Sequence, residues 1–451
     1  MSVELRITSA AWKQLSEHLL ADRHEHAAIL VCGHAHAESR EVLLVQQVLI
    51  AEEPGDAIAT SELGISLSPT FIARAAKAAR QVGGTVVLCH SHPFPGPVLP
   101  SALDLRTEQE LCGRALSARL SPVPVGSLIL GPDGFDGRVW RGFEARELSR
   151  LVVVGERVWI RQRGASSRIR DDHARQVLAW GDDGQHSLAN STVGVVGCGG
   201  TGSHVALQLA HLGVGRLVLV DHDVVEQSNL SRLVGVGAAW LGKPKVEAIA
   251  ALVRQVSSEI AVSEVVSSVL AVETSVLAQC DIIVVATDGH GSRAWLTEFA
   301  EQYLISLVDL GVEIQTGERM RAGGGVRVVS PGSGCLQCAG TLSSALVREE
   351  YLSSADRELE RRRGYLRGDG APTPSVVALN GVVASLAVLE VCELLTGLLG
   401  TPARRLLYRA ERRALTMTSI ERQEWCYVCG VGGLTGRGDG RLLPRRGGVA
   451  A

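Results

Sequence analysis

The sequence has no excess of charge of either sign. Its 451 residues include 45 Lys and Arg against 48 Asp and Glu, a formal net charge of −3. This balance gives no reason to expect a nucleic-acid partner, because such a partner requires clustered positive charge. The first residues, 1–4, also lack the basic and apolar regions of a secretory signal. We therefore expect a cytoplasmic protein.

The sequence has a single apolar run long enough to raise the question of a membrane span, at 376–399. The run contains Asn380, Glu390 and Glu393, and a carboxylate is costly in lipid. A buried helix is therefore favoured, and we expect no membrane association. A hydrophobic fraction of 46% and a length of 451 residues predict a packed globular chain of two or three domains.

Residues 1–145 alternate short apolar runs with helical stretches. A helix is predicted over 71–80, and strands are predicted at 28–31, 42–45, 86–89, 127–130 and 138–140. The turn sequence Gly-Pro-Asp-Gly at 131–134 predicts that the last two strands form a hairpin.

A cluster of candidate metal ligands follows the strand 86–89. His90 and His92 are separated by one residue, so both side chains can point toward one metal, and Asp104 is a suitable third ligand near the start of a helix. Three protein ligands leave the fourth position of a tetrahedral zinc ion open for water, which the metal activates. Ser101 lies one helical turn from Asp104 and can stabilise an oxyanion.

A proton shuttle is also needed, and Glu25 is the best candidate. Together these residues resemble the motif of the JAB/MPN family of JAMM metallopeptidases, over residues 1–145. The resemblance implies an α/β fold with a catalytic zinc ion. A JAMM-like fold that serves only as a scaffold is the alternative. A second His-x-His, His34 and His36, is expected in an exposed loop without a carboxylate placed to help.

Residues 146–167 are rich in Arg and are predicted to be a linker, and the Gly/Arg-rich tail at 431–451 is predicted to be disordered. Between them, at 168–430, strands and helices alternate. Strands are predicted at 193–196, 217–220 and 282–285, and helices at 201–212 and 245–256. This βαβ series predicts a parallel, doubly wound, Rossmann-like sheet.

A glycine-rich turn lies between the first strand and helix of this series, with glycines Gly197, Gly199, Gly200 and Gly202. Glycines allow close backbone approach to phosphates, and the helix N-terminus adds positive charge. Asp221 ends the next strand and can hold ribose hydroxyls. The turn alone suits NAD, FAD or ATP equally.

The residues that follow favour ATP. Asp223, Asn229, Arg232 and Lys245 succeed one another after the second strand, and the two cations suit a triphosphate. Asp288, after the strand 282–285, offers a carboxylate for Mg²⁺. An NAD- or FAD-dependent oxidoreductase remains the alternative, although it does not need these cations.

These segments resemble the ThiF/MoeB family, the bacterial relatives of ubiquitin-activating enzymes. The resemblance implies that Asp221 binds ribose, that Asn229, Arg232 and Lys245 contact phosphates, and that Asp288 binds magnesium. It also implies that Arg175, in the segment His-Ala-Arg-Gln-Val at 173–177, reaches the phosphates bound by a second subunit. A homodimer formed through this domain is therefore expected.

Two Cys-x-x-Cys pairs complete the resemblance, with cysteines Cys335, Cys338, Cys426 and Cys429. Converging in space, four thiolates form a closed structural zinc site; two redox dithiols are the alternative. Between Cys338 and Cys392 the chain has no cysteine, and it reads Ala-Pro-Thr-Pro at 371–374, where thioester-forming relatives have one. We therefore expect the product to be an acyl-adenylate.

The two halves together predict a bifunctional enzyme for a ubiquitin-like or sulfur-carrier protein that ends in Gly-Gly. The first half would cleave after the diglycine, and the second would adenylate the terminal glycine carboxylate with ATP and Mg²⁺. A non-catalytic scaffold that binds the carrier is the other hypothesis.

Overall fold

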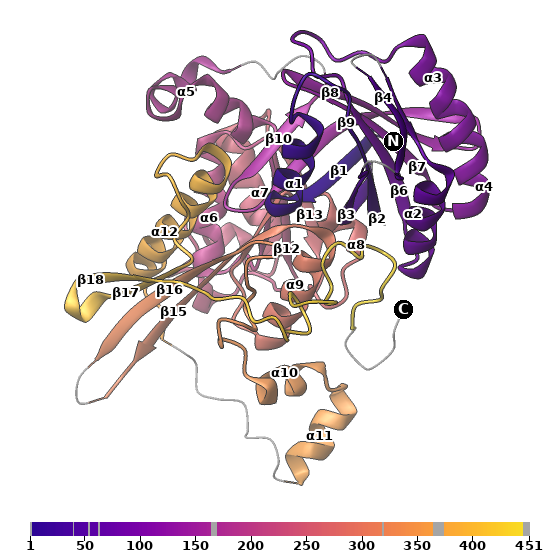
Figure 1. Cartoon of the computed structure of the whole chain (residues 1–451). Helices are drawn as coiled ribbons and strands as arrows, with labels where there is room; N and C mark the ends of the chain where they lie inside the picture. The colour runs from indigo at the N-terminus through magenta and orange to yellow at the C-terminus, as the bar shows by residue number, and fades with distance from the viewer. Residues whose placement is uncertain are drawn as a thin grey trace.

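In the computed structural model, two eight-stranded sheets succeed each other along the chain (Figure 1). The structure describes residues 2–38, 40–52, 55–61, 64–163, 169–317, 320–363 and 374–444. The N-terminal sheet, in indigo and purple, lies at the upper right of Figure 1, and the second domain fills the rest of the view.

The first sheet has the strand order β1-β3-β2-β6-β7-β8-β9-β10, and β9 also pairs with β1, which closes the strands into a ring. Its strands are β1 (Ser2–Thr8), β2 (Ala27–Ala37), β3 (Arg40–Ile50), β6 (Thr85–Ser91), β7 (Val125–Gly131), β8 (Gly134–Arg141), β9 (Glu144–Val154) and β10 (Val158–Gln162). A separate two-stranded sheet consists of β4 (Ala57–Ser61) and β5 (Gly64–Leu67).

Helices cover both faces of this sheet, because successive apolar residues of a strand point to opposite faces and both faces are therefore apolar. In β2, Leu30 belongs to the cluster that α1 (Ser9–Leu19) covers, and Ile29 to the cluster under α2 (Pro69–Gln81). The remaining helical segments are α3 (Ala102–Glu108), the π-helical segment Gln109–Leu116 and α4 (Ser117–Leu120). The predicted strands, helix and hairpin are thus present.

The prediction of a linker is wrong for residues 146–162, which form most of β9 and all of β10. Their many arginines conceal a buried apolar run at 151–154, preceded by the buried Leu148. Arg150 is buried as well, because acidic residues surround it. Paired arginines therefore give a strand the composition of a linker.

The second sheet has the order β13-β12-β11-β14-β15-β16-β17-β18 and confirms the Rossmann-like prediction. Its first five strands are parallel: β13 (Ala261–Val266), β12 (Arg216–Asp221), β11 (Thr192–Val196), β14 (Ile282–Val285) and β15 (Ser306–Gln315). The antiparallel extension is β16 (Arg321–Val329), β17 (Arg405–Arg409) and β18 (Ala414–Thr418). The chain reverses strand order between β11 and β14, where doubly wound sheets bind ligands.

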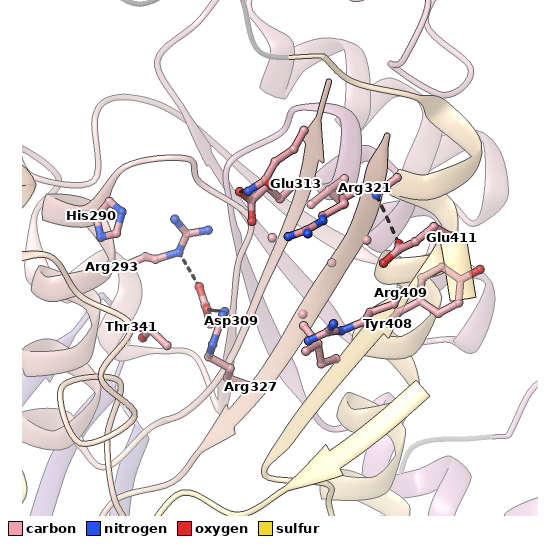
Figure 2. A pocket seen from close by; sticks show the side chains of 18 residues that line it. His290, Arg293, Asp309, Glu313, Arg321, Arg327, Thr341, Tyr408, Arg409 and Glu411 are labelled. Carbon is pink, nitrogen blue, oxygen red and sulfur yellow. Dashed lines mark hydrogen bonds and ion pairs between the residues drawn. The ribbon is translucent and has the colours of Figure 1, made fainter. Parts of the chain in front are cut away.

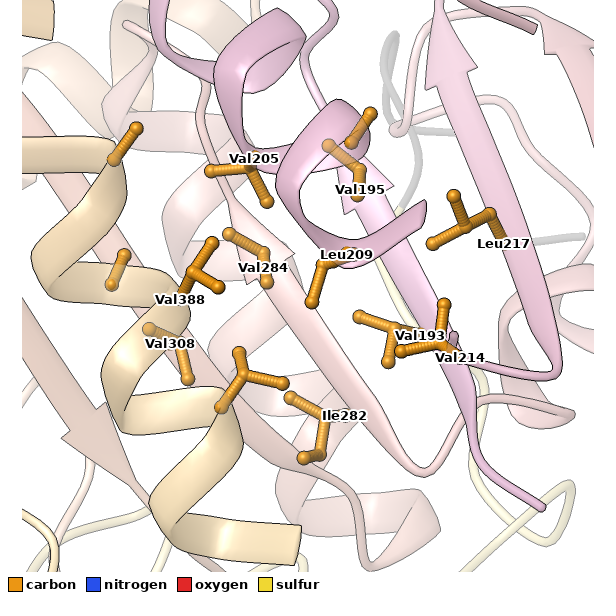
Figure 3. Packing of buried hydrophobic residues seen from close by; sticks show 14 of the residues in the cluster. Val193, Val195, Val205, Leu209, Val214, Leu217, Ile282, Val284, Val308 and Val388 are labelled. Carbon is orange, nitrogen blue, oxygen red and sulfur yellow. The ribbon is translucent and has the colours of Figure 1, made fainter. Parts of the chain in front are cut away.

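The helices of this domain are α5 (Ala174–Ala189), α6 (Gly200–Leu212), α7 (Lys245–Val256), α8 (Thr274–Ala278), α9 (His290–Tyr303), α10 (Ser344–Tyr351), α11 (Ser354–Arg362) and α12 (Val377–Thr396). Figure 3 shows Val205 and Leu209 of α6 and Val388 of α12 packed over Val284 and Val308 of the sheet. By length and composition alone α12 could cross a membrane, yet 61% of its most apolar window is buried. Its place in this core explains its composition.

The two domains share their apolar cores. Val152, Val154 and Val158 of the first sheet belong to the cluster around α6 and α12. Ala35 and Val42, also of the first sheet, belong to the cluster around α9. Neither face would be covered if the domains separated.

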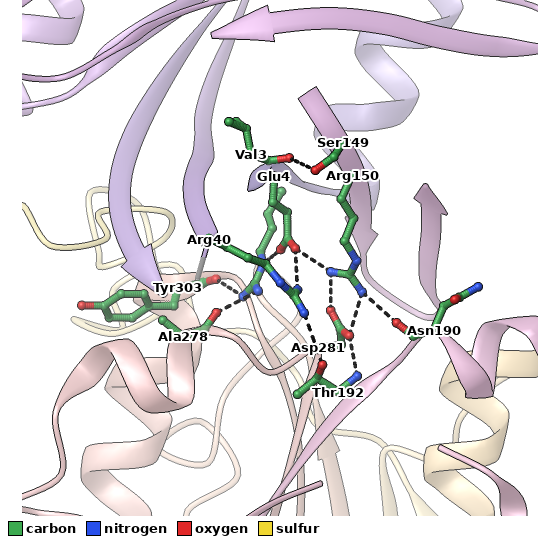
Figure 4. A network of polar contacts seen from close by, with 11 residues as sticks. Val3, Glu4, Arg40, Ser149, Arg150, Asn190, Thr192, Ala278, Asp281 and Tyr303 are labelled. Atoms are coloured by element: carbon green, nitrogen blue, oxygen red, sulfur yellow. Dashed lines mark hydrogen bonds and ion pairs between the residues drawn. The ribbon is translucent and has the colours of Figure 1, made fainter. Parts of the chain in front are cut away.

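A buried ionic network crosses the same boundary (Figure 4). Glu4 of β1 is fully buried and accepts hydrogen bonds from Arg150 at 2.6 Å and Arg40 at 2.9 Å. Burial alone would raise the pKa of Glu4, but the adjacent arginines hold it far below its usual range. Arg6, which also binds Glu4, donates to the backbone oxygens of Tyr303 and Ala278 in the second domain.

The C-terminal segment also joins the domains, and the prediction of disorder is wrong for residues 431–444. The segment runs between α9 and β2 (Figure 1): the amides of Gly436 and Gly438 donate to the backbone of α9, and that of Asp439 donates to His34 at 2.8 Å. Both glycines adopt positive φ, which suits their residue type. Backbone pairing thus orders a segment with little apolar content.

Candidate active sites

The first candidate site lies where β6 ends. His90 and His92 project from β6 and the residue after it, and Nε2 of each lies 3.4–3.5 Å from the carboxylate of Asp104. All three side chains are about one fifth exposed, and their ligand atoms lie within 4.8 Å of one another. The structure therefore brings together the three predicted ligands.

Glu25 lies beside this cluster, with Oε1 3.8 Å from Nε2 of His92. Burial raises the pKa of Glu25, which favours a proton-accepting and proton-releasing role. The neighbouring His26 points elsewhere, because its Nε2 lies 3.1 Å from Asp22. The chain thus presents Glu25 rather than His26 to the histidine pair.

Ser101 is the N-cap of α3, and its hydroxyl accepts a hydrogen bond from the backbone amide of Asp104 at 3.1 Å. In return, the Asp104 carboxylate accepts from the Ser101 amide at 2.7 Å. This reciprocal cap fixes the orientation of Asp104. Burial alone would raise the pKa of Asp104, but the adjacent His90 ring and the Ser101 cap hold it far below its usual range.

The donor set fits a divalent metal. Two imidazoles and one carboxylate suit zinc with an open coordination position. Within the described residues, Nε2 of His90 is buried and has no hydrogen-bond partner of good geometry. A metal ion between His90, His92 and Asp104 would satisfy that atom.

His34 and His36 differ from expectation. Both lie in β2 rather than in a loop, and each has a carboxylate partner. Nε2 of His34 lies 2.9 Å from Glu41, and Nδ1 of His36 lies 3.1 Å from Asp439. The sequence conceals this arrangement because Asp439 belongs to the segment expected to be disordered.

The second candidate site is the glycine turn after β11. Gly197 adopts a φ of +94°, and a Cβ there would lie 2.5 Å from the backbone oxygen of Ala286. A Cβ on Gly202 would lie 1.8 Å from the backbone oxygen of Gly197. Only glycine fits at either position, so the turn brings bare backbone to the N-terminus of α6. Gly199 and Gly200 complete it.

Acidic and basic side chains surround this turn. Asp221, at the end of β12, accepts hydrogen bonds from the amides of Cys198 at 2.6 Å and Asp223 at 2.8 Å. Lys245 begins α7, and its Nζ contacts the Asp223 carboxylate at 2.7 Å. The structure therefore places a fixed carboxylate and a paired lysine beside the turn.

Asn229 and Arg232 lie on the segment between β12 and α7. Asn229 is buried and caps its own short helix, accepting from the Glu226 amide. The Cδ atom of Arg232 lies 3.3 Å from where a Cβ on Gly200 would be, so the arginine lies beside the turn.

Asn380 also lies at the glycine turn, although no role at this site was predicted for it from the sequence. It is 2% exposed in α12, and its Nδ2 lies 2.4 Å from the same Gly200 position. An isolated amide in an apolar run was the available indication.

A groove of about 530 Å³ lies over β15, β16 and β17 of the second domain (Figure 2). Its floor is the glycine run of β16, Gly323, Gly324 and Gly325, and its charged walls include Arg293, Arg321, Arg327 and Arg409. The buried carboxylate of Asp309 holds Arg293 at 2.7 Å and Arg327 at 2.8 Å. Nε of Arg327 is buried without a partner among the described residues. Glu313 and Glu411 also line the groove, so its walls carry charges of both signs.

The groove approaches the nucleotide turn through Arg293, whose Nη1 donates to the backbone oxygen of Asp288 at 3.2 Å. Asp288 follows β14 and is exposed. The groove was not predicted from the sequence, where the run Arg-Ala-Gly-Gly-Gly-Val-Arg at 321–327 is its one local sign.

Arg175 lies far from these groups along the chain and is exposed at the start of α5. Leu178, one turn later, is 88% exposed. The structure contains a single chain, so the expected contact of Arg175 with a second subunit stays a prediction.

The four cysteines predicted to bind zinc converge. Sγ atoms of Cys335 and Cys426 lie 3.7 Å apart, and those of Cys338 and Cys429 lie 3.4 Å apart. Hydrogen bonds from the neighbouring thiols outweigh burial and lower the pKa of Cys429 to about 5. Free thiols with four-fold convergence suit a closed zinc site better than two separate dithiols.

Other cysteines offer no exposed nucleophile among the described residues. Cys392 is 2% exposed, and burial raises its pKa to about 12. Cys198 and Cys280 are fully buried. Residues 371–373 of the Ala-Pro-Thr-Pro segment lie outside the described residues.

Two family models match the chain, and each covers one of the two candidate sites. The ThiF family model matches residues 173–428, more than half of the chain. A second model, prokaryotic homologs of the JAB domain, matches residues 8–142.

Individual relatives agree with the ThiF match. The chain is 37% identical over 213 residues to "Adenylyltransferase and sulfurtransferase MOCS3" of Arabidopsis thaliana, covering 40% of this chain and 45% of the relative. It is 29% identical to "Sulfur carrier protein ThiS adenylyltransferase" of Escherichia coli K12, covering 55% of this chain and 89% of the relative. The chain spans about half the length of the MOCS3 relatives from Arabidopsis thaliana and Bos taurus. Among solved structures, E. coli MccB with ATP matches with a TM-score of 0.46 and 23% identity, over 58% of this chain and 75% of that one.

Proposed function

Because the chain belongs to the ThiF family and carries a JAB-type domain ahead of it, we propose that it processes and activates a small carrier protein. The carrier is a ubiquitin-like or sulfur-carrier protein ending in Gly-Gly. The first site hydrolyses the peptide bond after the diglycine, and the second adenylates the exposed glycine carboxylate with ATP. The names of relatives such as the ThiS adenylyltransferase support the choice of carrier. We place this activity in the cytoplasm.

The groove floored by β16 is the observation that most supports the adenylation step. Gly325 presents open backbone, since a Cβ there would meet no atom closer than 3.4 Å. Two consecutive glycines could lie against such a floor without side-chain clashes. Arg293 and Arg327 supply positive charge for the terminal carboxylate, and Arg293 links the groove to Asp288.

In the adenylation step, a carboxylate oxygen of the carrier attacks the α-phosphorus of ATP, and the bond to pyrophosphate breaks. The glycine turn and Lys245 hold the phosphates, and Asp221 orients the ribose. A magnesium ion, held by Asp288, would neutralise phosphate charge. No protein nucleophile is needed, because the two reactants only have to be aligned. The acyl-adenylate is the released or transferred product.

In the cleavage step, a zinc ion held by His90, His92 and Asp104 would supply an activated water. Glu25 takes the proton from that water and delivers it to the leaving amine. The products are the carrier with a free terminal glycine and the removed amine-bearing segment. The same site could release carrier from a conjugate.

Pyrophosphate exchange tests the adenylation claim. Wild-type protein with ATP, Mg²⁺ and a carrier ending in Gly-Gly should exchange labelled pyrophosphate into ATP, and omission of the carrier should abolish the exchange. Gly325→Val should reduce exchange by about 100-fold, because it fills the groove floor. Gly237→Ala is the matched control, since a Cβ there meets nothing within 4 Å. Exchange that occurs without carrier, or nicotinamide turnover instead, would contradict the proposal.

A further inference from the structure

A second group of potential metal ligands consists of His34, His36 and Glu41. His90 pairs with Ala27 near the start of β2, whereas His34 and His36 lie near the end of that strand. Glu41 of β3 lies directly opposite His36 of β2 in the sheet register, and His34 is two residues away on the same strand. Successive side chains of a strand alternate in direction, so His34 and His36 share one face. One ligand atom from each of the three residues lies within 4.8 Å of the others.

Asp439 of the C-terminal segment contacts His36, one of the three potential ligands. Its Oδ2 accepts from the His36 backbone amide at 2.9 Å and lies 3.1 Å from the ring Nδ1. Its Oδ1 accepts from the hydroxyl of Tyr303 at 2.8 Å, and its own amide donates to His34. Held by these bonds, the Asp439 carboxylate orients the His36 ring, as the outer partners of metal-binding histidines do.

The group is built like the first candidate site. Each has two histidines separated by one residue, on a strand or at its end, with a carboxylate near them. Its inner side is closed and its outer side is open, since the side chains of Glu41 and His34 are 3% and 10% exposed and that of His36 is 55% exposed. A cation can therefore enter past His36.

Two arginines oppose cation binding at present. Arg141 donates a hydrogen bond to Glu41, and Nη1 of Arg146 lies 3.9 Å from the same carboxylate. Their side chains are 38% and 45% exposed, so both can turn into solvent. Both arginines compete with a metal for Glu41. Removing one of them should therefore strengthen metal binding.

We propose that this group is an additional site for a divalent transition metal of the zinc class, with ligands His34, His36 and Glu41. Two imidazoles with one carboxylate are a donor set that such ions accept. Because Asp439 of the C-terminal segment holds the ring of the ligand His36, metal binding tightens the hold of that segment on the first domain. The site is independent of the proposed cleavage and adenylation.

Cobalt binding to the full-length chain carrying His90→Ala tests the proposal, because that change disables the first metal site. We expect two equivalents of Co²⁺ per chain: one with sulfur-to-metal charge-transfer bands from the four cysteines, and one with d–d bands only. Adding His36→Ala should remove the second equivalent and leave the charge-transfer bands intact. His24→Ala is the matched control, since His24 is also exposed and lies 3.2 Å from a carboxylate. An unchanged cobalt content in the His36→Ala chain would refute the site.

Two further variants of the same chain sharpen the outcome. Asp439→Asn should weaken cobalt binding by roughly 10- to 100-fold. Arg141→Ala should strengthen it, because it removes the competing cation. Cobalt should also slow hydrogen exchange at residues 436–441, and not after His36→Ala. Weaker binding in Arg141→Ala, or unchanged exchange at residues 436–441, would overturn the proposal.

Discussion

Arg150 of β9 binds Asp281 through two hydrogen bonds of 2.8 Å, and this pair joins the two domains inside the protein (Figure 4). Asp281 also accepts from the Thr192 amide at the start of β11, so one carboxylate fixes a strand of each sheet. With apolar clusters shared across the same boundary, the two candidate active sites are held in a fixed relation.

Asp281→Asn should lower the free energy of unfolding by about 3–5 kcal/mol, because it leaves Arg150 buried without its main counter-charge. Urea unfolding followed by tryptophan fluorescence would measure this, and both domains should unfold in one transition. Glu110→Gln is the control: it breaks an exposed pair with Arg114, worth less than about 0.5 kcal/mol. Two separated transitions in the wild-type protein would contradict the shared core.

Glu25→Gln should abolish cleavage after Gly-Gly while the metal content stays unchanged, because Glu25 transfers protons and lies outside the ligand set. Cleavage of a carrier with a C-terminal extension, followed by mass spectrometry, is the measurement. His26→Gln should cleave normally, since the His26 ring is directed at Asp22. The opposite pattern would assign the proton transfer to His26.

Much of this arrangement is predictable from sequence, where local pattern and motif agree. The glycine turn, the strands 193–196 and 282–285 and the helix 245–256 follow from hydrophobic periodicity, and the structure has them within a residue. The convergence of the four cysteines also follows from their spacing. In the turn, strands and helix a residue's environment is set by neighbours close in the chain, whereas the two cysteine pairs are 91 residues apart and are predicted by their repeated spacing.

Other features depend on partners far along the chain. In the sequence, Arg150 is part of an arginine-rich stretch that resembles a linker. The structure shows that Arg150 is paired with Glu4 and Asp281. Asp439 lies in a stretch whose composition predicts disorder. The structure shows that backbone groups of this stretch form hydrogen bonds with α9 and β2. No single sequence motif predicts the groove of β16, because residues of α9, β15 and β17 also line it. Long-range charge pairing and backbone pairing leave little trace in local composition.

Glu390→Gln should stabilise the protein above pH 7. Burial raises the pKa of Glu390 from 4.5 to about 7, so the folded state binds a proton more tightly than the unfolded state does. Stability is therefore lost as pH rises from about 4.5 to 7, and glutamine avoids this loss while still accepting from the Ala403 amide.

The gain should reach about 1–3 kcal/mol at pH 8 and vanish below pH 4.5. Urea unfolding at pH 4.5, 6 and 8 measures it, with the exposed Glu247→Gln as control. A gain that does not change with pH would show that Glu390 stays ionised in the folded protein.

Arg175→Ala and Asp288→Ala should each abolish pyrophosphate exchange if Arg175 completes the site of a second subunit. Mixing the two inactive variants should restore up to about one quarter of the activity, because a hybrid dimer contains one intact composite site. The exposed Leu178 beside Arg175 suits a surface that a second copy covers. Activity that does not return on mixing would place Arg175 in its own chain's site.

The most direct test of the coupled function starts from a carrier with residues beyond its Gly-Gly. With ATP and Mg²⁺, the wild-type chain should convert this precursor into the trimmed carrier adenylate. The Glu25→Gln chain should adenylate only a carrier already trimmed. Acid-quenched mass spectrometry distinguishes precursor, trimmed carrier and adenylate. If the Glu25→Gln chain converts the precursor as wild type does, or if wild type forms no adenylate from trimmed carrier, the two sites do not act in this sequence.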